Sequence, residues 1–216
     1  LTEPARGNAS HGLLRYAPYR VGSHGDAHVV LHATIHPQPG YPFLVDTSVR
    51  YEVSEAGLVV THEAVNVGQR RAPWACGAHP YLAVGGRDAA DLTLTVPASS
   101  AIVTDERLLP VRTVPVDAPD APAGADLRAG RRLSELDLDL GLVDVAHEGG
   151  VAGSTLLDDD GRGVRLWQDE AFGAVVVFTP RDFPGIDGVR QAVAVEPMSA
   201  PADALNSGEG LAWLEP

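Results

Sequence analysis

The sequence predicts an all-β protein built as a large antiparallel β-sandwich. Short segments of alternating or continuous apolar residues recur along its 216 residues, and 23 glycines and 17 prolines separate them at short intervals. No convincing amphipathic helix longer than about two turns interrupts this pattern. Many short strands divided by turn residues favour a sandwich over folds in which strands alternate with helices.

The first half of the chain contains four predicted strands. Residues 27–37 (AHVVLHATIHP) alternate between apolar and polar side chains, as a half-buried strand does. Residues 43–54 and 58–65 read as two strands joined at a turn over residues 55–57. Residues 91–98 (DLTLTVPA) alternate again. These segments are among the short strands from which the antiparallel sandwich is predicted.

The second half adds a hairpin and two buried strands. Residues 153–169 predict a hairpin whose acidic, glycine-bearing middle, Asp158 to Gly163, is the turn. Residues 173–180 (GAVVVFTP) and 191–197 (QAVAVEP) are continuous apolar runs, typical of strands buried on both faces. Residues 125–136 are the best candidate for a helix, and residues 113–127, rich in Pro, Ala and Asp, predict a long exposed loop.

Length and charge narrow the class of protein. A chain of this size is expected to form one domain over residues 1–216 with a sizeable core. The net charge is −13 and all 16 basic residues are arginines, which opposes a nucleic-acid partner or an anionic membrane surface. The single Cys76 cannot form an internal disulfide, and there is no signal segment or membrane-length apolar run, so we expect a cytoplasmic protein.

Two clusters of potential metal ligands do not predict a metal site. Four histidines recur every four residues: His24, His28, His32 and His36. On a strand, side chains four residues apart lie about 13 Å from each other, too far for one zinc ion. The acidic turn at 158–163 lacks the spaced ligands of a calcium loop. Glu135, Asp137 and Asp139 share one strand parity, which predicts an exposed acidic face.

Two ionisable residues next to prolines stand out. Glu196 ends an apolar strand, where an unpaired buried carboxylate would be costly, so it must be hydrogen-bonded or face a cleft. His79 lies between a turn of small residues and Pro80. A structural cap or ion pair explains either residue as well as catalysis does. Neither position identifies a function by itself.

Four motifs, taken in order, carry a family resemblance. They are NASHGLLR at 8–15, VNVGQRRAPWACGAHPYL at 65–82, LVDVAH at 142–147 and AVEPMSAPADALNSGEGL at 194–211. With them the chain resembles the aldose 1-epimerase (galactose mutarotase) family over essentially its whole length. The resemblance implies a large antiparallel β-sandwich and an isomerase of carbohydrate metabolism that interconverts the α and β anomers of a free hexose.

The resemblance also implies roles for particular residues. Glu196 would be the base that takes the proton of the C1 hydroxyl, and His79 the acid that protonates the ring oxygen. The substrate-binding residues would be His11, Asp144, Tyr81 and Asn8. The reaction needs no metal and no cofactor, the expected partner is a hexose, and a homodimer is left open.

The chain departs from the family pattern in two places. The family's Asn-Arg motif upstream of Asn8 is not in this chain, so we expect the sandwich to lack its N-terminal strands here. The strand ending at Phe178 has no glutamine, which predicts sugar contacts unlike those for galactose. Two alternatives therefore stay open beside the epimerase: a hexose-6-phosphate 1-epimerase, and a carbohydrate-binding sandwich without activity.

Overall fold

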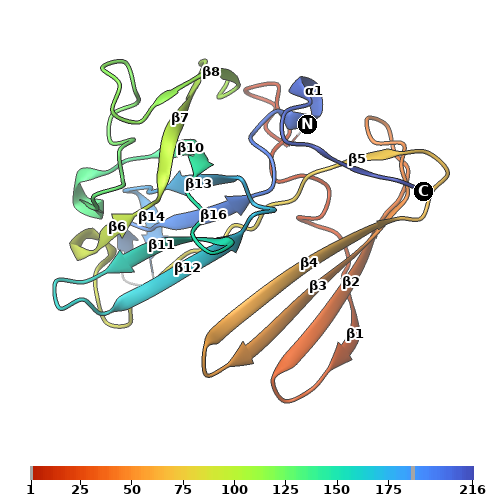
Figure 1. The fold of residues 1–216 in the computed structure, drawn as a ribbon, viewed down its shortest axis with the longest axis horizontal. Coiled ribbons are helices and arrows are strands. Elements are labelled where there is room, and N and C mark those ends of the chain that lie inside the picture. The colour runs from red at the N-terminus through yellow and green to blue at the C-terminus, as the bar shows by residue number, and fades with distance from the viewer. Residues whose placement is uncertain (1, 186–187) are drawn as a thin grey trace. The chain divides into compact units, whose positions relative to one another are not determined.

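The computed structural model describes residues 2–185 and 188–216, in which strands predominate (Figure 1). The predicted all-β fold class is confirmed. The chain divides into two compact units, Leu1–Trp74 with Ala212–Pro216, and Ala75–Leu211. Each unit has its own core, and the single domain expected over 1–216 remains a prediction. No helix in the described parts of the chain has the length and apolar character needed to cross a bilayer.

The first unit is a four-stranded antiparallel sheet whose strands follow chain order. Its strands are β1 (Arg20–His24), β2 (His28–Ile35), β3 (Val45–Ser54) and β4 (Gly57–Asn66). The β3–β4 hairpin confirms the two strands predicted over 43–54 and 58–65. A short pair, β5 (Ala72–Trp74) with β17 (Ala212–Leu214), brings the C-terminal segment into this unit.

One face of this sheet changes from buried to exposed along its length. On β3, Val45 and Val49 are buried, whereas Tyr51 and Val53, further along the same face, are exposed. Leu58, which is paired with Val53 on β4, is exposed as well. The core of the unit, built around Ile35, Tyr41, Val45 and Ala72, therefore covers only one end of the apolar face.

The second unit contains two larger antiparallel sheets. The five-stranded sheet has the order β16 (Ala194–Met198), β13 (Ala174–Phe178), β10 (Asp139–Val145), β7 (Ala98–Thr104) and β8 (Pro110–Pro115). The four-stranded sheet has the order β12 (Gly163–Asp169), β11 (Val151–Leu157), β6 (Thr93–Thr95) and β9 (Arg131–Arg132). A small pair, β14 (Phe183–Gly185) with β15 (Gly188–Arg190), and the four-residue helix α1 (Ala204–Ser207) complete it.

Both sheets of the second unit contribute to one core. Val175, Val177 and Val195 of the five-stranded sheet share a cluster of buried residues with Leu94 and Leu156 of the four-stranded sheet. This is the packing of a β-sandwich. The alternate residues of β13 lie on the open face of its sheet, where Val176 and Phe178 are only half-buried. The strand predicted over 173–180 thus has one fully buried face instead of two.

The structure corrects two local predictions. Residues 125–136 form β9 and a single 3-10 turn, Leu133–Glu135, where a helix was expected. Gly130 has a left-handed backbone (φ 84°) and lies so close to β6 that an added Cβ would be 3.0 Å from Thr93 Cγ2. The loop expected over 113–127 begins only after β8 and is not wholly exposed, because Val116, Ala125 and Leu127 are buried in the core.

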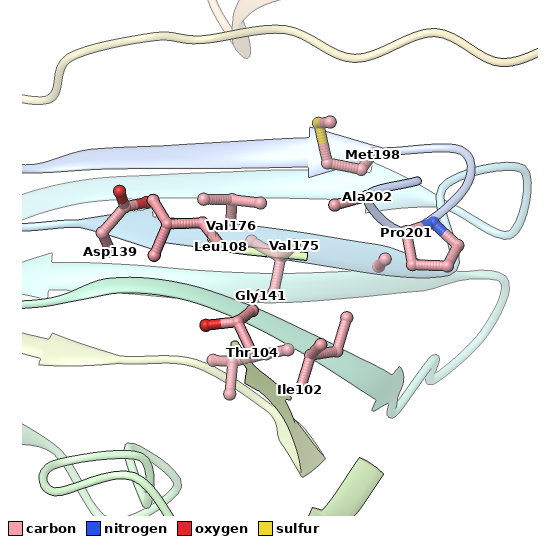
Figure 2. Close-up of a pocket in the computed structure, with 12 residues that line it drawn as sticks. Ile102, Thr104, Leu108, Asp139, Gly141, Val175, Val176, Met198, Pro201 and Ala202 are labelled. Atoms are coloured by element: carbon pink, nitrogen blue, oxygen red, sulfur yellow. The ribbon is translucent and has the colours of Figure 1, made fainter. Parts of the chain in front are cut away.

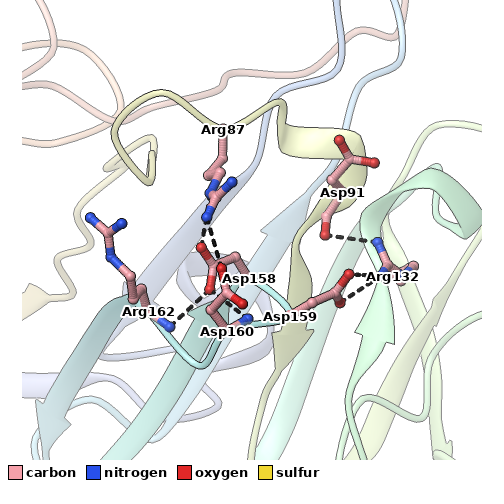
Figure 3. A network of polar contacts seen from close by, with 7 residues as sticks. All are labelled: Arg87, Asp91, Arg132, Asp158, Asp159, Asp160 and Arg162. Carbon is pink, nitrogen blue, oxygen red and sulfur yellow. Dashed lines mark hydrogen bonds and ion pairs between the residues drawn. The ribbon is translucent and has the colours of Figure 1, made fainter.

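β11 and β12 pair antiparallel, which confirms the predicted hairpin. A network of arginine and aspartate side chains holds the turn between them (Figure 3). The Asp158 carboxylate accepts hydrogen bonds from the backbone N–H groups of Asp160 and Arg162, and from Arg87 Nε at 2.9 Å. Arg132 binds the Asp159 carboxylate and donates to the carbonyl of Asp91. These contacts tie the turn to the segment before β6 and to β9.

Candidate active site

A segment without regular strand structure positions His79 by pairing alongside β16. Gly77 bridges Met198 and Tyr81 bridges Ala194, both antiparallel, so the register places His79 directly opposite Glu196. The Val195 N–H donates to the carbonyl of Pro80 at 3.4 Å, and the Leu82 N–H donates to the carbonyl of Val193 at 2.9 Å. Proline has no N–H to donate and holds φ near −65°, which stiffens the backbone next to the imidazole.

The two side chains predicted to be the catalytic pair lie in contact. His79 Nε2 is 3.2 Å from Glu196 Oε1, and the Glu196 side chain is 11% exposed against 30% for His79. Glu196 pairs with Val176 of β13, so its carboxylate lies on the open face of the five-stranded sheet, away from the core. A buried carboxylate and a more accessible imidazole are therefore presented together on one surface.

Burial controls the proton affinity of Glu196. Desolvation of the carboxylate, followed by the nearby negative charge of Asp139, raises the pKa of Glu196 to about 7. A protonated His79 would favour the ionised carboxylate, and burial is the stronger influence. A carboxyl group with a pKa near neutrality can take up and release a proton at physiological pH, which is the property required of a general acid–base group.

Aromatic rings border the pair. The His79 ring lies 5.1 Å from the Tyr81 ring and 6.4 Å from the Phe178 ring, and Tyr81 lies 5.0 Å from Phe183 of β14. Burial and the charge of Glu196 raise the pKa of Tyr81, so its phenol remains a neutral hydrogen-bond donor. These rings offer an apolar wall with one hydroxyl beside the acid–base pair.

The structure does not bring Asp144 to the pair. Gly141 of β10 lies across Val176 from Glu196 in the sheet register, and Asp144 is three residues further along, about 10 Å away in the strand direction. Asp144 also has a left-handed backbone (φ 53°), which interrupts the alternation of side chains at that end of β10. The carboxylate near Glu196 is instead that of Asp139, at the start of the same strand.

The remaining sequence-predicted residues belong to the first unit. His11 is exposed and adopts a left-handed backbone (φ 61°), and Asn8 forms an isolated bridge with Glu3. Their part in substrate binding stays a prediction. Within residues 2–185 and 188–216, no three His, Cys, Asp or Glu side chains are grouped as a metal site would require.

Sequence reasoning missed Asp139 and Phe183 as neighbours of the pair. The alternation of residues in the sequence predicted that Asp139 lies on an exposed face. Only the register of β10 against β13 shows that this face is also the one on which Glu196 lies. Phe183 lies in a Pro- and Gly-rich segment with no strand pattern, and only its contact with Tyr81 reveals it.

The chain is similar to a known protein over nearly its whole length. The chain is 28% identical over 216 residues to a protein of Escherichia coli K12, the uncharacterized protein YihR. The match covers 96% of this chain and 63% of that protein. The chain thus spans less than two thirds of the length of this relative.

Solved structures share the fold. A galactose mutarotase-like protein from Clostridium acetobutylicum superposes with a TM-score of 0.82 at 18% identity, over 100% of this chain and 68% of that one. A GalM/aldose epimerase homologue from C. elegans superposes with a TM-score of 0.75 at 21% identity, over 92% and 64%. The family model for aldose 1-epimerase matches residues 2–216. The chain belongs to the aldose 1-epimerase family.

Proposed function

We propose that this chain is an aldose 1-epimerase that interconverts the α and β anomers of a hexose, with Glu196 as general base and His79 as general acid. The observation that supports this most directly is the contact of 3.2 Å between His79 Nε2 and Glu196 Oε1 on the open face of the sheet.

The distance suits the reaction because the two oxygens that exchange protons are close together in the sugar. The C1 hydroxyl and the ring oxygen are both bonded to C1, so a base and an acid that act on them at the same time must be near neighbours. A carboxylate and an imidazole in hydrogen-bond contact meet this requirement without a metal.

Ring opening transfers two protons, one to Glu196 and one from His79. The Glu196 carboxylate takes the proton of the C1 hydroxyl while the bond between C1 and the ring oxygen breaks and C1 becomes an aldehyde carbon. Protonated His79 gives its proton to the released oxygen, which becomes the C5 hydroxyl. Rotation about the C1–C2 bond presents the other face of the aldehyde. Closure returns one proton to His79 and one from Glu196 to the C1 oxygen, and yields the other anomer.

The aromatic wall complements this chemistry. Tyr81 lies next to His79, and Phe183 lies next to Tyr81; these two rings would pack against the C–H face of the sugar ring. The Tyr81 hydroxyl and the Asp139 carboxylate interact electrostatically with Glu196, and both would bind sugar hydroxyls. His11, Asn8 and Asp144 remain proposed substrate contacts on the strength of the family motifs alone.

Polarimetry tests this proposal. Freshly dissolved α-D-glucose and α-D-galactose should reach their anomeric equilibrium faster with the protein than without it. The Glu196→Gln and His79→Asn variants should each lose about 10²- to 10⁴-fold of the enzymatic rate, because each removes one proton transfer. Glu170→Gln and His36→Asn, at exposed positions outside the site, serve as matched controls and should retain the rate.

The outcomes separate the epimerase from its alternatives. Acceleration that survives in both Glu196→Gln and His79→Asn would assign catalysis to other groups. If no free sugar reacts faster with the folded protein, a hexose 6-phosphate is assayed next. Sugar binding in calorimetry with no acceleration of either class would identify a carbohydrate-binding sandwich.

A further inference from the structure

The strand pair β14–β15 is fastened at both of its ends to one backbone carbonyl group. Arg181 lies two residues before β14, and Gln191 directly follows β15. Arg181 Nε donates a hydrogen bond to the carbonyl oxygen of Leu136 at 3.0 Å, and Gln191 Nε2 donates to the same oxygen at 3.1 Å. A single backbone oxygen thus accepts a hydrogen bond from each end of the strand pair.

The same two side chains bind further carbonyl groups of that segment. Arg181 Nη2 donates to the carbonyl of Ser134 at 2.9 Å, and Gln191 Nε2 donates to the carbonyl of Leu133 at 2.5 Å. Hydrogen bonds from a charged guanidinium are stronger than those between neutral groups. Leu133 and Leu136 are buried in the core of the second unit. These four hydrogen bonds, which we name the Arg181–Gln191 clamp, therefore hold the strand pair to the core.

The strand pair carries one ring of the proposed aromatic wall. Phe183 is the first residue of β14, and its ring lies 5.0 Å from the Tyr81 ring, which lies 5.1 Å from the His79 ring. The Phe183 side chain is 37% exposed, so its packing is one-sided and the position of its backbone decides where the ring lies. The clamp acts on that backbone, because Arg181 is only two residues from Phe183.

The segment that supports the clamp also leads into a second proposed substrate contact. Asp139 comes three residues after Leu136 in the chain. Figure 2 shows Asp139 beside a small pocket, which it lines together with Val176. Val176 is paired with Glu196, the proposed base. The support of the strand pair is therefore continuous with the strand that presents a carboxylate to the site, so the clamp links the Phe183 ring to the rest of the sugar-binding groups.

We propose that Arg181 and Gln191 are positioning residues of the active site, and that their clamp holds the Phe183 ring where it packs against a bound hexose. This inference rests on the proposed epimerase function. Binding groups keep a productive geometry when a surrounding shell of hydrogen bonds fixes the elements that carry them. Neither Arg181 nor Gln191 is assigned a proton transfer, so the clamp acts on substrate binding and leaves the chemical step to His79 and Glu196.

Steady-state mutarotation of D-glucose and D-galactose, followed by polarimetry, tests the clamp. We expect Arg181→Ala and Gln191→Leu each to raise KM about tenfold and to leave kcat within about threefold of the wild type, because a displaced ring weakens binding without altering the proton transfers. Arg181→Lys keeps the charge but lacks the fork of donors that binds two carbonyls, so it should raise KM as well. Arg112→Ala removes an exposed arginine of β8 and is the control, which should retain both constants.

A double-mutant cycle shows whether the clamp acts through Phe183. Phe183→Ala should raise KM to a similar extent, and Arg181→Ala/Phe183→Ala should raise it no further than either single substitution. A clamp that only stabilised the fold would lower the fraction of active enzyme, and hence the apparent kcat, with KM unchanged. An unchanged KM in Arg181→Ala, or effects that add in the double variant, would overturn the inference.

The inference and the proposed function fail in different ways. Wild-type acceleration together with an unchanged KM in Arg181→Ala would remove the role of the clamp and leave the epimerase intact. If no sugar is accelerated, the proposed function has failed, and calorimetric titration of the wild type and Arg181→Ala with the same sugars decides on the clamp. Binding about tenfold weaker in the variant would support it, whereas equal binding, or no binding by either protein, would overturn it.

Discussion

The burial of Glu196 opposes the ionisation that its proposed role requires. To act as a base its carboxyl group must ionise, yet burial raises its pKa to about 7, which means that the folded protein favours the protonated form. Between the ordinary pKa of a glutamate and this value, the folded state binds more protons than the unfolded state. The free energy of unfolding therefore falls as the pH rises from about 4.5 to about 7.

The Glu196→Gln variant should be more stable than the wild type at alkaline pH. A shift of this size corresponds to about 3 kcal/mol, since one pKa unit is 1.36 kcal/mol. We expect Glu196→Gln to exceed the wild type by up to about this amount at pH 8, with little difference at pH 4. Urea denaturation at both pH values measures it, and an equal difference at pH 4 and pH 8 would show that ionisation is not the cause.

Asp139 should influence the pH at which Glu196, the proposed base, ionises. Its charge contributes to the raised pKa of Glu196, so Asp139→Asn should lower that pKa and move the acidic limb of the kcat/KM profile to lower pH. The pH dependence of mutarotation measures this shift. Asp26→Asn, exposed in the first unit, is the control, and a limb that does not move would contradict the assigned influence of Asp139.

At the scale of secondary-structure elements, the turn between β11 and β12 depends on one carboxylate. The Asp158 side chain is 7% exposed and binds the Arg87 guanidinium at 2.9 Å. The backbone N–H of Arg162, the Asp160 N–H and Arg87 hold the pKa of Asp158 below its ordinary value. The stability this provides is present at neutral pH and is lost as the pH falls through the lowered pKa.

Asp158→Asn should lower the Tm at pH 7, and its difference from the wild type should shrink as the pH falls through the lowered pKa of Asp158 and its carboxylate takes up a proton. Asp160→Asn is the matched control, because its side chain also binds Arg87 but is 74% exposed. Thermal unfolding followed by circular dichroism at pH 7 and pH 3 tests this. A larger effect at Asp160 than at Asp158 would refute it.

Elements defined by local sequence were predicted well, and contacts between distant segments were not. The β3–β4 hairpin and the turn at Asp158 follow from alternation and turn residues within a few positions. The helix expected over 125–136 fails because Gly130 packs closely against β6, a neighbour distant in sequence. His79 and Glu196 were found through motifs, but their contact arises from a register that joins residues 117 positions apart, which no local pattern encodes.

At the scale of the whole molecule, the exposed end of the first sheet is a large apolar surface. Val21, Tyr51, Val53, Leu58 and Val60 are all more than a third exposed, and the pairing of β1 to β4 places them on one face. Exposed patches of this kind favour association between copies.

Size-exclusion chromatography should therefore show the 216-residue chain eluting ahead of a monomer at tens of micromolar. The double variant Val53→Thr/Leu58→Thr should shift it toward the monomer position by reducing the apolar area. Val111→Thr, which changes a valine of equal exposure in the second unit, should have no effect. A wild-type chain that elutes as a sharp monomer would contradict this expectation.

Met198 is the only methionine of the chain, and it lies on β16 two residues from Glu196, with its sulfur packed over Gly77. Selective isotope labelling of methionine would consequently give a single ε-methyl resonance in a nuclear magnetic resonance spectrum. That one signal reports on the surroundings of Glu196, so that binding of a sugar can be followed without a turnover assay, without an engineered probe and without assigning any other residue.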